Sequence, residues 1–451
     1  MSGRLRDERG VAMVLVVFAT VILSVLGVAL LELVNDEQTR SAASVKSQES
    51  FQAAEAGVDD YLAKLVDDRA YYLHQVHAAE STRRPPSGAD VAAGTEWPYA
   101  NQWTYPTPKD AWKSLPNGYE YNLQITPPAA GQTTTTILAT GRRTGQTDSA
   151  RSIEVRVRPS SLADFYRFSD EDIPYGDGAI LYGKVYANGQ VRNNDGGYSV
   201  PAYGDIYAWG GISGSFSMQG TAKKYTTSTT PSITTKFTSP IDFSRFLVSF
   251  NDLSRAAQVS SRYFDDPSKL AWRFVFASDG TFTVRSCTAG SNPDVAKAAP
   301  TCGSTTTYTV PTNGAIYTGQ TAIVEGQVKG RVTIGSNDDI VIANNIGPVE
   351  PGTDVLGLVA YNDLWIADYG PSTLTWTASL LVQTNTWHTT SGAPNKNTMN
   401  FTGSSATKKG GGFNFDTRNY NYDQTLQYLS PPWFPVLDDF LVVSLFREVP
   451  A

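Results

Sequence analysis

The chain has 451 residues and a formal net charge of -7 at pH 7. This length predicts two or three folded units rather than one, and the acidic balance argues against a general nucleic-acid-binding surface, so no nucleic acid is expected as a partner. The 38 glycines, 23 tyrosines and 9 tryptophans are typical of an exported, β-rich protein.

An uncharged run of 21 residues, Val11 to Leu31, follows a polar leader over residues 1–10. At about 1.5 Å per residue, a helix of this length crosses a hydrocarbon core about 30 Å thick. The run is apolar on all sides, unlike a buried amphipathic helix, and it lacks the cleavage site of a secretory signal. We therefore expect a single transmembrane helix. Three arginines precede it, which places the N-terminus in the cytoplasm and the body outside the cytoplasmic membrane.

The helical pattern continues beyond the apolar run. Apolar residues recur at spacings of three, four or six, with polar residues between them, as in an amphipathic helix: Ala42, Val45, Phe51, Ala54, Val58, Leu62 and Leu65. No proline occurs before Pro85. We expect one helix over residues 11–66, whose second part packs on a folded domain.

A small β domain is expected over residues 67–160. Residues 70–115 are rich in Tyr, Trp and Pro without a sustained period, which is typical of a loop region. Three segments of alternating polarity follow, over 119–125, 134–140 and 153–157, and predict a small antiparallel sheet. Packing of the amphipathic helix on this sheet would bury Phe51, Val58, Leu62 and Leu65.

The first 66 residues resemble the N-terminal region of PilX-like minor pilins of type IV pili. The resemblance rests on the leader ending in Arg9-Gly10, the apolar start VAMVL, and the stretch SFQAAEAGV at residues 50–58. It implies that a prepilin peptidase cleaves after Gly10 and leaves Val11 as the new N-terminus. It also implies that the helix binds other pilins or pseudopilins, besides membrane lipid.

One position departs from the pattern of major pilins. They carry a glutamate at the fifth mature position, where this chain has Leu15, and the same absence is familiar in PilX-like proteins. This favours a filament tip, a low-abundance subunit, or a protein that is never processed. Small residues such as Gly27 offer surfaces for close helix contact, and Glu32 marks the end of the uncharged run.

The pattern of apolar and polar residues changes near Ser160. Short apolar segments separated by Gly or Asn predict the coils of a β-solenoid over residues 161–451, with a β-sandwich as the alternative. Residues 241–310 are expected to interrupt the coils with a helix and a hairpin that turns at Asp279-Gly280. The last apolar run, 440–446, is expected to cap the stack as a final strand.

The same region resembles DUF4900, a domain of unknown function that often follows PilX-like N-termini. The matching stretches are VLGLVAYNDLWIA at 355–367, TASLLVQTNTW at 377–387, YNYD at 420–423 and PPWFP at 431–435. Because that family has no assigned chemistry, the resemblance implies an architecture rather than an activity.

Two cysteines, Cys287 and Cys302, are 15 positions apart. Outside the cytoplasm a disulfide between them is expected, worth about 3 kcal/mol in the chain-entropy model. The three histidines, His74, His77 and His388, offer no zinc cluster, and no cofactor is expected.

The sequence holds no nucleophile elbow, phosphate-binding loop or metalloprotease motif. Five aspartates could meet on adjacent coils as in polysaccharide-cleaving enzymes, but each stands in an expected turn, where Asp binds local backbone amides: Asp338, Asp339, Asp354, Asp363 and Asp368. Residues 193–197 and 337–339 supply oxygen ligands without the spacing of an EF-hand calcium loop.

These features predict a non-enzymatic, membrane-inserted, PilX-like minor pilin or pseudopilin-like subunit that helps assemble, cap or decorate a filament. The alternative is a membrane-anchored adhesin or glycan-binding protein that is independent of pili. A membrane-tethered glycan lyase is a third hypothesis. Aromatic residues that could form a glycan-binding face are Tyr198, Tyr203, Tyr207, Trp209, Tyr361, Trp365, Trp376 and Trp387.

Overall fold

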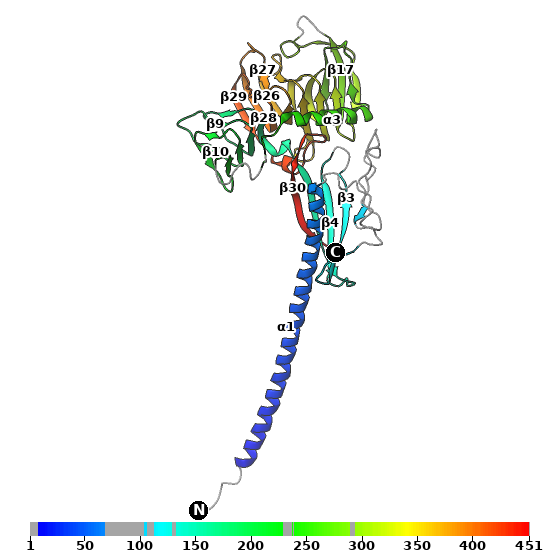
Figure 1. Cartoon of the computed structure of the whole chain (residues 1–451), viewed down its shortest axis with the longest axis vertical. Coiled ribbons are helices and arrows are strands. Elements are labelled where there is room, and N and C mark those ends of the chain that lie inside the picture. The colour runs from blue at the N-terminus through cyan, green and yellow to red at the C-terminus, as the bar shows by residue number, and fades with distance from the viewer. Residues whose placement is uncertain are drawn as a thin grey trace, which may run out of the picture.

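A long helix carries a small sheet, and a larger β body lies beyond the sheet (Figure 1). The computed structural model describes residues 8–67, 103–105, 112–128, 132–228, 237, 239–288 and 294–450. His74, His77 and nearly all of the expected loop region at 70–115 lie outside these residues. The two ends of the described chain lie far apart. The helix begins at its end remote from the small sheet, and the C-terminus lies beside that sheet.

Helix α1 runs from Glu8 to Asp67 and has 60 residues. Its second half packs on the small sheet through a core that contains Ala54, Val58, Tyr61 and Leu65. Phe51 and Leu62 lie at the border of this core and are partly buried. Among the residues whose side chains are described, no helix combines the length and the apolar character needed to cross a membrane.

The three alternating segments form an antiparallel sheet, as predicted. Its strands are β1 (Trp103–Tyr105), β2 (Lys113–Ser114), β3 (Tyr119–Thr126), β4 (Thr135–Arg143), β5 (Arg151–Ser161) and β30 (Val436–Val449). They lie in the order β1-β3-β4-β5-β30, and β2 pairs with β3. Alternate residues such as Leu123, Ile125 and Ile137 point toward α1, which is why the sequence shows a period of two.

The position of strand β30 shows that one prediction was wrong. The segment 440–446 was expected to cap the solenoid, and the solenoid was expected to extend to residue 451. Instead β30 pairs antiparallel with β5, and Val443 lies opposite Val157. The chain therefore leaves the β body near residue 435 and returns to the small sheet, so that both ends of the body are tied to one sheet.

The β body is a solenoid of parallel strands and not a sandwich, so the chain as a whole is mainly β. One face of the stack consists, in spatial order, of β15 (Tyr263–Phe264), β20 (Ala315–Thr318), β22 (Arg331–Ser336), β24 (Val355–Ala360), β26 (Thr373–Val382), β28 (Lys396–Thr407), β6 (Phe165–Ser169), β8 (Lys184–Ala187), β11 (Ile206–Ala208) and β14 (Lys224–Thr226). Every pairing along this face is parallel, which requires stacked coils rather than hairpins.

A second face of the same coils consists of β16 (Ala271–Phe276), β21 (Thr321–Val328), β23 (Ile340–Pro348), β25 (Leu364–Ile366) and β27 (Trp387–Thr389). The expected hairpin at Asp279-Gly280 is present, because β16 pairs antiparallel with β17 (Thr281–Thr288). However, β16 is also a coil strand, because it pairs parallel with β21. The strands that project from the stack are β17 and its antiparallel partners β18 (Thr301–Cys302) and β19 (Thr306–Thr309), so the hairpin interrupts the coils less than predicted.

The order of the coils differs from the order of the chain. The first coil strand, β6, lies beside the last long coil strand, β28, in the middle of the stack. From β6 the chain builds coils outward to β14, and it then begins again at the opposite end with β15. The solenoid thus consists of two runs, residues 165–226 and 263–421, that meet at β28 and β6.

Helix α3 (Leu247–Val259) connects these runs by lying along the side of the stack (Figure 1). Phe246 packs on Phe168 of β6, with ring centroids 6.3 Å apart. Further along, Phe250 packs on Tyr361, and the Ala256 carbonyl accepts a hydrogen bond of 2.9 Å from Asn313. The helix was expected as an insertion between coils, but it lies against several of them, because it carries the chain from the middle of the stack, at β6, to the end formed by β15.

Candidate functional site

Small residues let the backbone of α1 approach the sheet closely. Ser50, Ala53, Ala54 and Gly57 are all buried against it. On the other side of the contact, Gly141 of β4 has no room for a side chain, because an added Cβ would lie 2.1 Å from the Ser50 carbonyl oxygen. The stretch at 50–58 that carries the pilin resemblance therefore has a physical role, since larger side chains would separate helix and sheet.

An acidic residue on α1 strengthens this contact. Asp60 accepts hydrogen bonds from Lys64 at 2.9 Å and from the Tyr121 hydroxyl at 2.9 Å, and Lys113 lies 3.4 Å away. Burial acts to raise the pKa of Asp60, but the hydrogen bond and charge of Lys64, with the other two partners, lower it below its ordinary value. Asp60 therefore stays ionised and joins α1 to β2 and β3.

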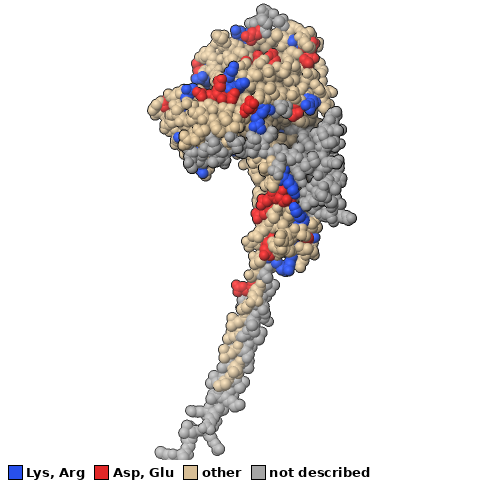
Figure 2. All heavy atoms as spheres, in the orientation of Figure 1, with Lys and Arg blue, Asp and Glu red and all other residues tan. Residues whose placement is uncertain are grey.

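The first half of α1 exposes a series of large apolar side chains. Phe18 is 66% exposed and Leu23 is 67% exposed. The other exposed members of this series are Val16, Leu26, Leu30 and Val34. Figure 2 shows that the described part of this half of α1 carries mainly uncharged side chains, whereas acidic and basic groups gather on the β body and around the small sheet. Exposed apolar side chains in such a series are typical of a surface that contacts lipid or protein.

The residues predicted to act in processing and assembly lie on the backbone of α1. Gly10, Val11, Leu15, Gly27 and Glu32 are all within its bounds. Their side-chain surroundings lie outside the part of the chain that the structure describes, so their roles stay predictions.

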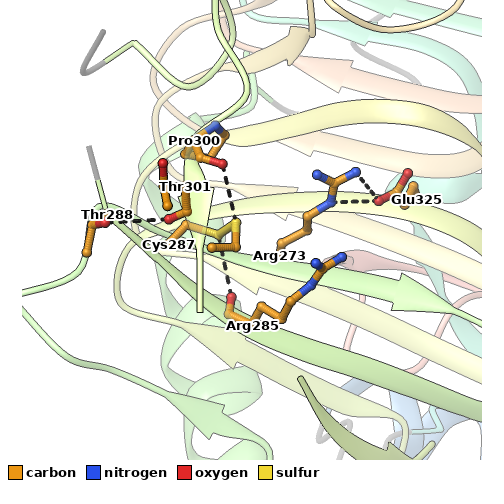
Figure 3. Close-up of a disulfide and its surroundings, with 8 residues drawn as sticks. Arg273, Arg285, Cys287, Thr288, Pro300, Thr301 and Glu325 are labelled. Atoms are coloured by element: carbon orange, nitrogen blue, oxygen red, sulfur yellow. Dashed lines mark hydrogen bonds and ion pairs between the residues drawn. A yellow bond between two sulfur atoms is a disulfide. The ribbon is translucent and has the colours of Figure 1, made fainter. Parts of the chain in front are cut away.

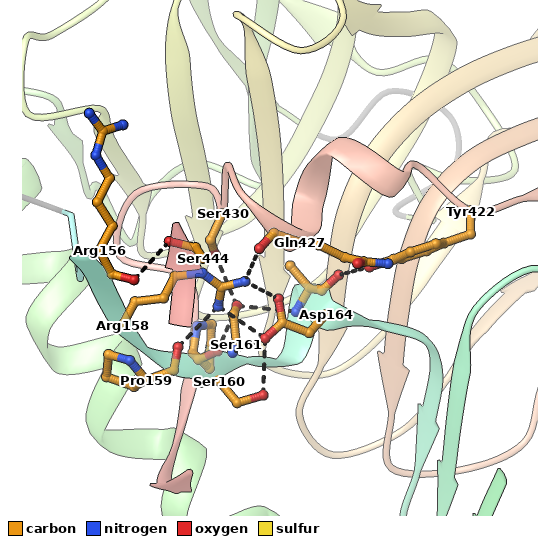
Figure 4. Close-up of polar contacts among 12 residues, drawn as sticks. Arg156, Arg158, Pro159, Ser160, Ser161, Asp164, Tyr422, Gln427, Ser430 and Ser444 are labelled. Atoms are coloured by element: carbon orange, nitrogen blue, oxygen red, sulfur yellow. Dashed lines mark hydrogen bonds and ion pairs between the residues drawn. The ribbon is translucent and has the colours of Figure 1, made fainter. Parts of the chain in front are cut away.

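A buried ion pair joins the small sheet to the β body (Figure 4). Arg158 of β5 is 1% exposed and binds both carboxylate oxygens of Asp164, at 3.0 and 2.5 Å. The Arg158 guanidinium also donates to the Gln427 carbonyl at 2.5 Å. Asp164 accepts two further hydrogen bonds, from the Ser160 hydroxyl and the Ser161 amide. Because three segments converge on one guanidinium, this junction fixes how the β body sits on the small sheet.

The five aspartates that could meet on adjacent coils do so only in part. At one corner, Asn362 donates to Asp338 at 2.8 Å, and the Asp363 amide donates to Asp339 at 3.0 Å. Asp354 lies at another turn, where it accepts the amides of Gly330 and Glu350. Asp368 lies at a further corner and accepts the Thr390 hydroxyl. These contacts agree with the interpretation of the aspartates as turn residues.

An aromatic pair covers the corner ladder formed by Asp338, Asp339 and Asp363. The Trp365 indole donates to Asp339 at 2.9 Å and stacks on His388, whose Nε2 lies 3.2 Å from Asp363. Burial and the neighbouring charge of Asp338 raise the pKa of Asp339 to about 6. Burial acts in the same direction on Asp363, but the hydrogen bond from His388 and those from the next coil lower its pKa below the ordinary value. The ladder thus contains two carboxyl groups of unlike acidity.

No metal site is seen in the part of the chain that the structure describes, where no three His, Cys, Asp or Glu side chains are arranged to hold an ion. In the loop considered for calcium, Asp195 accepts the Gly197 amide at 2.9 Å and Asn193 donates to the Tyr198 and Ser215 carbonyls. These side chains are thus used in local hydrogen bonds.

Cys287 and Cys302 form a disulfide with an S–S distance of 2.01 Å (Figure 3). They lie opposite each other on β17 and β18. Cys287 is buried beside Ala271 and Ile323, so the bond holds the projecting strands on the second face of the solenoid. Nearby, the ion pair between Arg273 and Glu325 joins β16 to β21.

The predicted aromatic face is divided in the structure. Trp376 and Trp387 are buried in the solenoid core, and Tyr207 stacks on Tyr225 with ring centroids 4.8 Å apart. Tyr203, by contrast, is 60% exposed. The remaining members pack at the border of the cores or at the corner ladder.

No protein-family model and no curated protein matches this chain. Among solved structures, the competence-associated pilin ComZ from Thermus thermophilus is similar over 90% of this chain and 97% of its own, with 12% sequence identity and a TM-score of 0.32. The finer resemblances to PilX-like proteins and to DUF4900 therefore remain proposals.

Proposed function

We propose that this chain is a pilin-like structural subunit, of the PilX-like minor kind, that displays a β-solenoid outside the cytoplasmic membrane. The observation that carries the proposal is the contrast between the two halves of α1. The second half is docked on the small sheet through Ala54 and Gly57, whereas the first half exposes Phe18, Leu23 and Leu30. A helix with such halves is suited to an anchor in lipid that later bundles with neighbouring helices.

The proposal includes processing and partners. A prepilin peptidase would remove the leader after Gly10, and Val11 would begin the mature chain. Leu15, in place of the usual glutamate, would leave the helix without a charged partner for the subunit ahead of it, which favours the tip of the filament. The body would assist assembly, cap or decorate the filament, and no covalent chemistry is assigned to it.

Photo-crosslinking tests the proposal. A benzophenone amino acid at Phe18 should crosslink to lipid and to other pilins, because this side chain faces outward. The matched control is the same group at Tyr428, which is equally exposed but lies on the β body. Crosslinks from position 428 to the same pilins, with none from position 18, would contradict assembly through α1.

A surface adhesin that does not depend on filaments is the second candidate. It is favoured by exposed aromatic residues on the body, such as Tyr203. The two candidates differ in a deletion strain. Loss of filaments, or a change in their number or length, supports the pilin proposal, whereas normal filaments with lost attachment support the adhesin.

A further inference from the structure

A cleft opens where the two runs of the solenoid meet. Over residues 396–402, β28 pairs with β29 (Phe415–Asn421), but over 405–407 it pairs with β6. Strands β29 and β6 separate beside Gly403 of β28. This glycine lies so close to β26 that an added Cβ would be 1.9 Å from the Ala378 carbonyl oxygen. Between β29, β6 and the loop at 174–182 lies a cavity of about 690 Å³. This volume is in the range of ligand sites in proteins.

The cleft is lined by buried polar groups that lack partners. Tyr175 is 8% exposed, and its hydroxyl has no hydrogen-bond partner among the described residues. The buried Nε of Arg167 also has none, and no carboxylate of the described chain pairs with its guanidinium. Burial raises the pKa of Tyr175 to about 12, so that its hydroxyl remains a neutral donor. Unsatisfied buried donors destabilise a folded protein, and an acceptor on a ligand would remove this cost.

Aromatic rings form the walls of the cleft. Trp387 lies at its base, with the Arg167 guanidinium 5.9 Å from the ring centroid. Tyr182, which lines the cleft, stacks parallel to the exposed Tyr203 next to it, with centroids 6.3 Å apart and an interplanar angle of 7°. Flat exposed rings favour a ligand with an apolar face and a polar edge. Asn419 and Asn421 add uncharged polar groups to the lining.

We propose that this cleft binds a carbohydrate that carries a carboxylate. The Tyr182 and Tyr203 rings pack on the C–H faces of the sugar units, while Arg167 and the Tyr175 hydroxyl bind the carboxylate. A guanidinium binds a carboxylate in a bidentate manner, which would give the half-buried Arg167 the partner that the described chain lacks. The lining carries two arginines, Arg167 and Arg418, and two aspartates, Asp177 and Asp416, so their formal charges balance. This balance suits a ligand with one negative charge better than a phosphate with two.

Binding by the full-length protein in detergent micelles tests this site. Three acidic probes are compared with matched neutral ones: oligogalacturonate with its methyl ester, sialyllactose with lactose, and a hyaluronan oligosaccharide with an uncharged chitooligosaccharide. Tryptophan fluorescence, to which Trp387 contributes from inside the cleft, reports binding. We expect at least one acidic probe to bind, and its neutral counterpart to bind at least tenfold more weakly.

Variants separate the site from general effects. Arg167→Gln should weaken binding of the acidic probe at least tenfold while leaving the neutral probe unchanged. Tyr175→Phe, which removes only the hydroxyl, should weaken it severalfold, and Tyr203→Ala should weaken both probes. Tyr428→Ala is the matched control and should change neither, because this exposed tyrosine lines another cavity and not the cleft. Thermal unfolding midpoints equal to wild type show that each variant is folded.

Two results would overturn the proposal. If none of the three acidic probes binds the folded protein, the cleft is not an acidic-carbohydrate site. If a probe binds but Arg167→Gln binds it as tightly as wild type does, the carboxylate is not recognised here. Neither result depends on filament assembly, so the pilin proposal can fail or stand separately.

Discussion

Replacement of Gly141 by alanine tests how α1 is held on the small sheet. The new Cβ would lie 2.1 Å from the Ser50 carbonyl oxygen and 2.4 Å from the Ala54 amide nitrogen. Both are backbone atoms, which cannot rotate away. An ordinary contact begins near 3.4 Å, so helix and strand must separate locally by about 1.3 Å, the difference between 3.4 and 2.1.

The expected cost of this separation is about 2 kcal/mol, the middle of the range for overpacked cores. Hydrogen exchange measured on peptides of β3 and β4 reports it, because these strands cover the contact. A loss of about 2 kcal/mol should accelerate their slowest exchange about 30-fold. Exchange in β22, inside the solenoid, should not change.

Gly196→Ala is the matched control. Gly196 is exposed, and an added Cβ there meets no atom within 4 Å. We expect a change within about 0.5 kcal/mol. Equal exchange in Gly141→Ala and wild type, or an equal loss in both alanine variants, would refute the close approach of α1 to β4.

Two further predictions concern the junction and the corner ladder. Arg158→Met should destabilise the folded chain by about 3–5 kcal/mol, because the Asp164 carboxylate would stay buried without its cation. Chemical unfolding followed by circular dichroism measures this loss, and a loss below about 1 kcal/mol would contradict a buried pair. Arg156→Met, at an exposed site, is the control. Asp339→Asn should stabilise the body by about 1 kcal/mol at pH 7.5 and should have little effect at pH 4. The sign follows from the raised pKa of Asp339, since the stability present below pH 3.8 is lost as the pH rises through about 6. An unchanged pH dependence in Asp339→Asn would be contrary to this assignment.

The small sheet was predictable because its signal is local. Residues 119–125 alternate between the helix face and the outer face, and the same holds for β4 and β5. One buried face and one half-buried face give a period of two, whatever lies elsewhere in the chain. The solenoid could be predicted in the same way from its short apolar segments and tight turns.

Pairings between distant residues could not be predicted. The apolar segment 440–446 is equally suited to a solenoid strand and to a strand of the small sheet, and only its pairing with residues 151–161 decides between them. The junction of β28 with β6 joins residues more than 200 positions apart, at Ser405 and Arg167. The cleft was missed for this reason, because it exists only where those two runs meet.

The burial of Arg158 could not be predicted from its place in the strand. Arg158 follows Glu154 and Arg156 in an alternating strand, a pattern that suggests a solvent-exposed row. Yet Arg156 is exposed and Arg158 is buried, because the return of the chain at Gln427 covers one end of β5. The interpretation of the aspartates as turn residues agrees with the structure, since the preference of Asp for backbone amides is a local property.

The role that we propose for α1, as the anchor and assembly helix of a pilin-like subunit, is tested most directly at the N-terminus of the natural protein. Intact-mass and N-terminal peptide analysis of the chain from its native membrane or filament fraction measures where the chain begins. We expect a mature protein that starts at Val11, after removal of the leader ending at Gly10. A chain that begins at Met1 or Ser2 in that fraction would contradict the proposal that this chain is processed as a pilin.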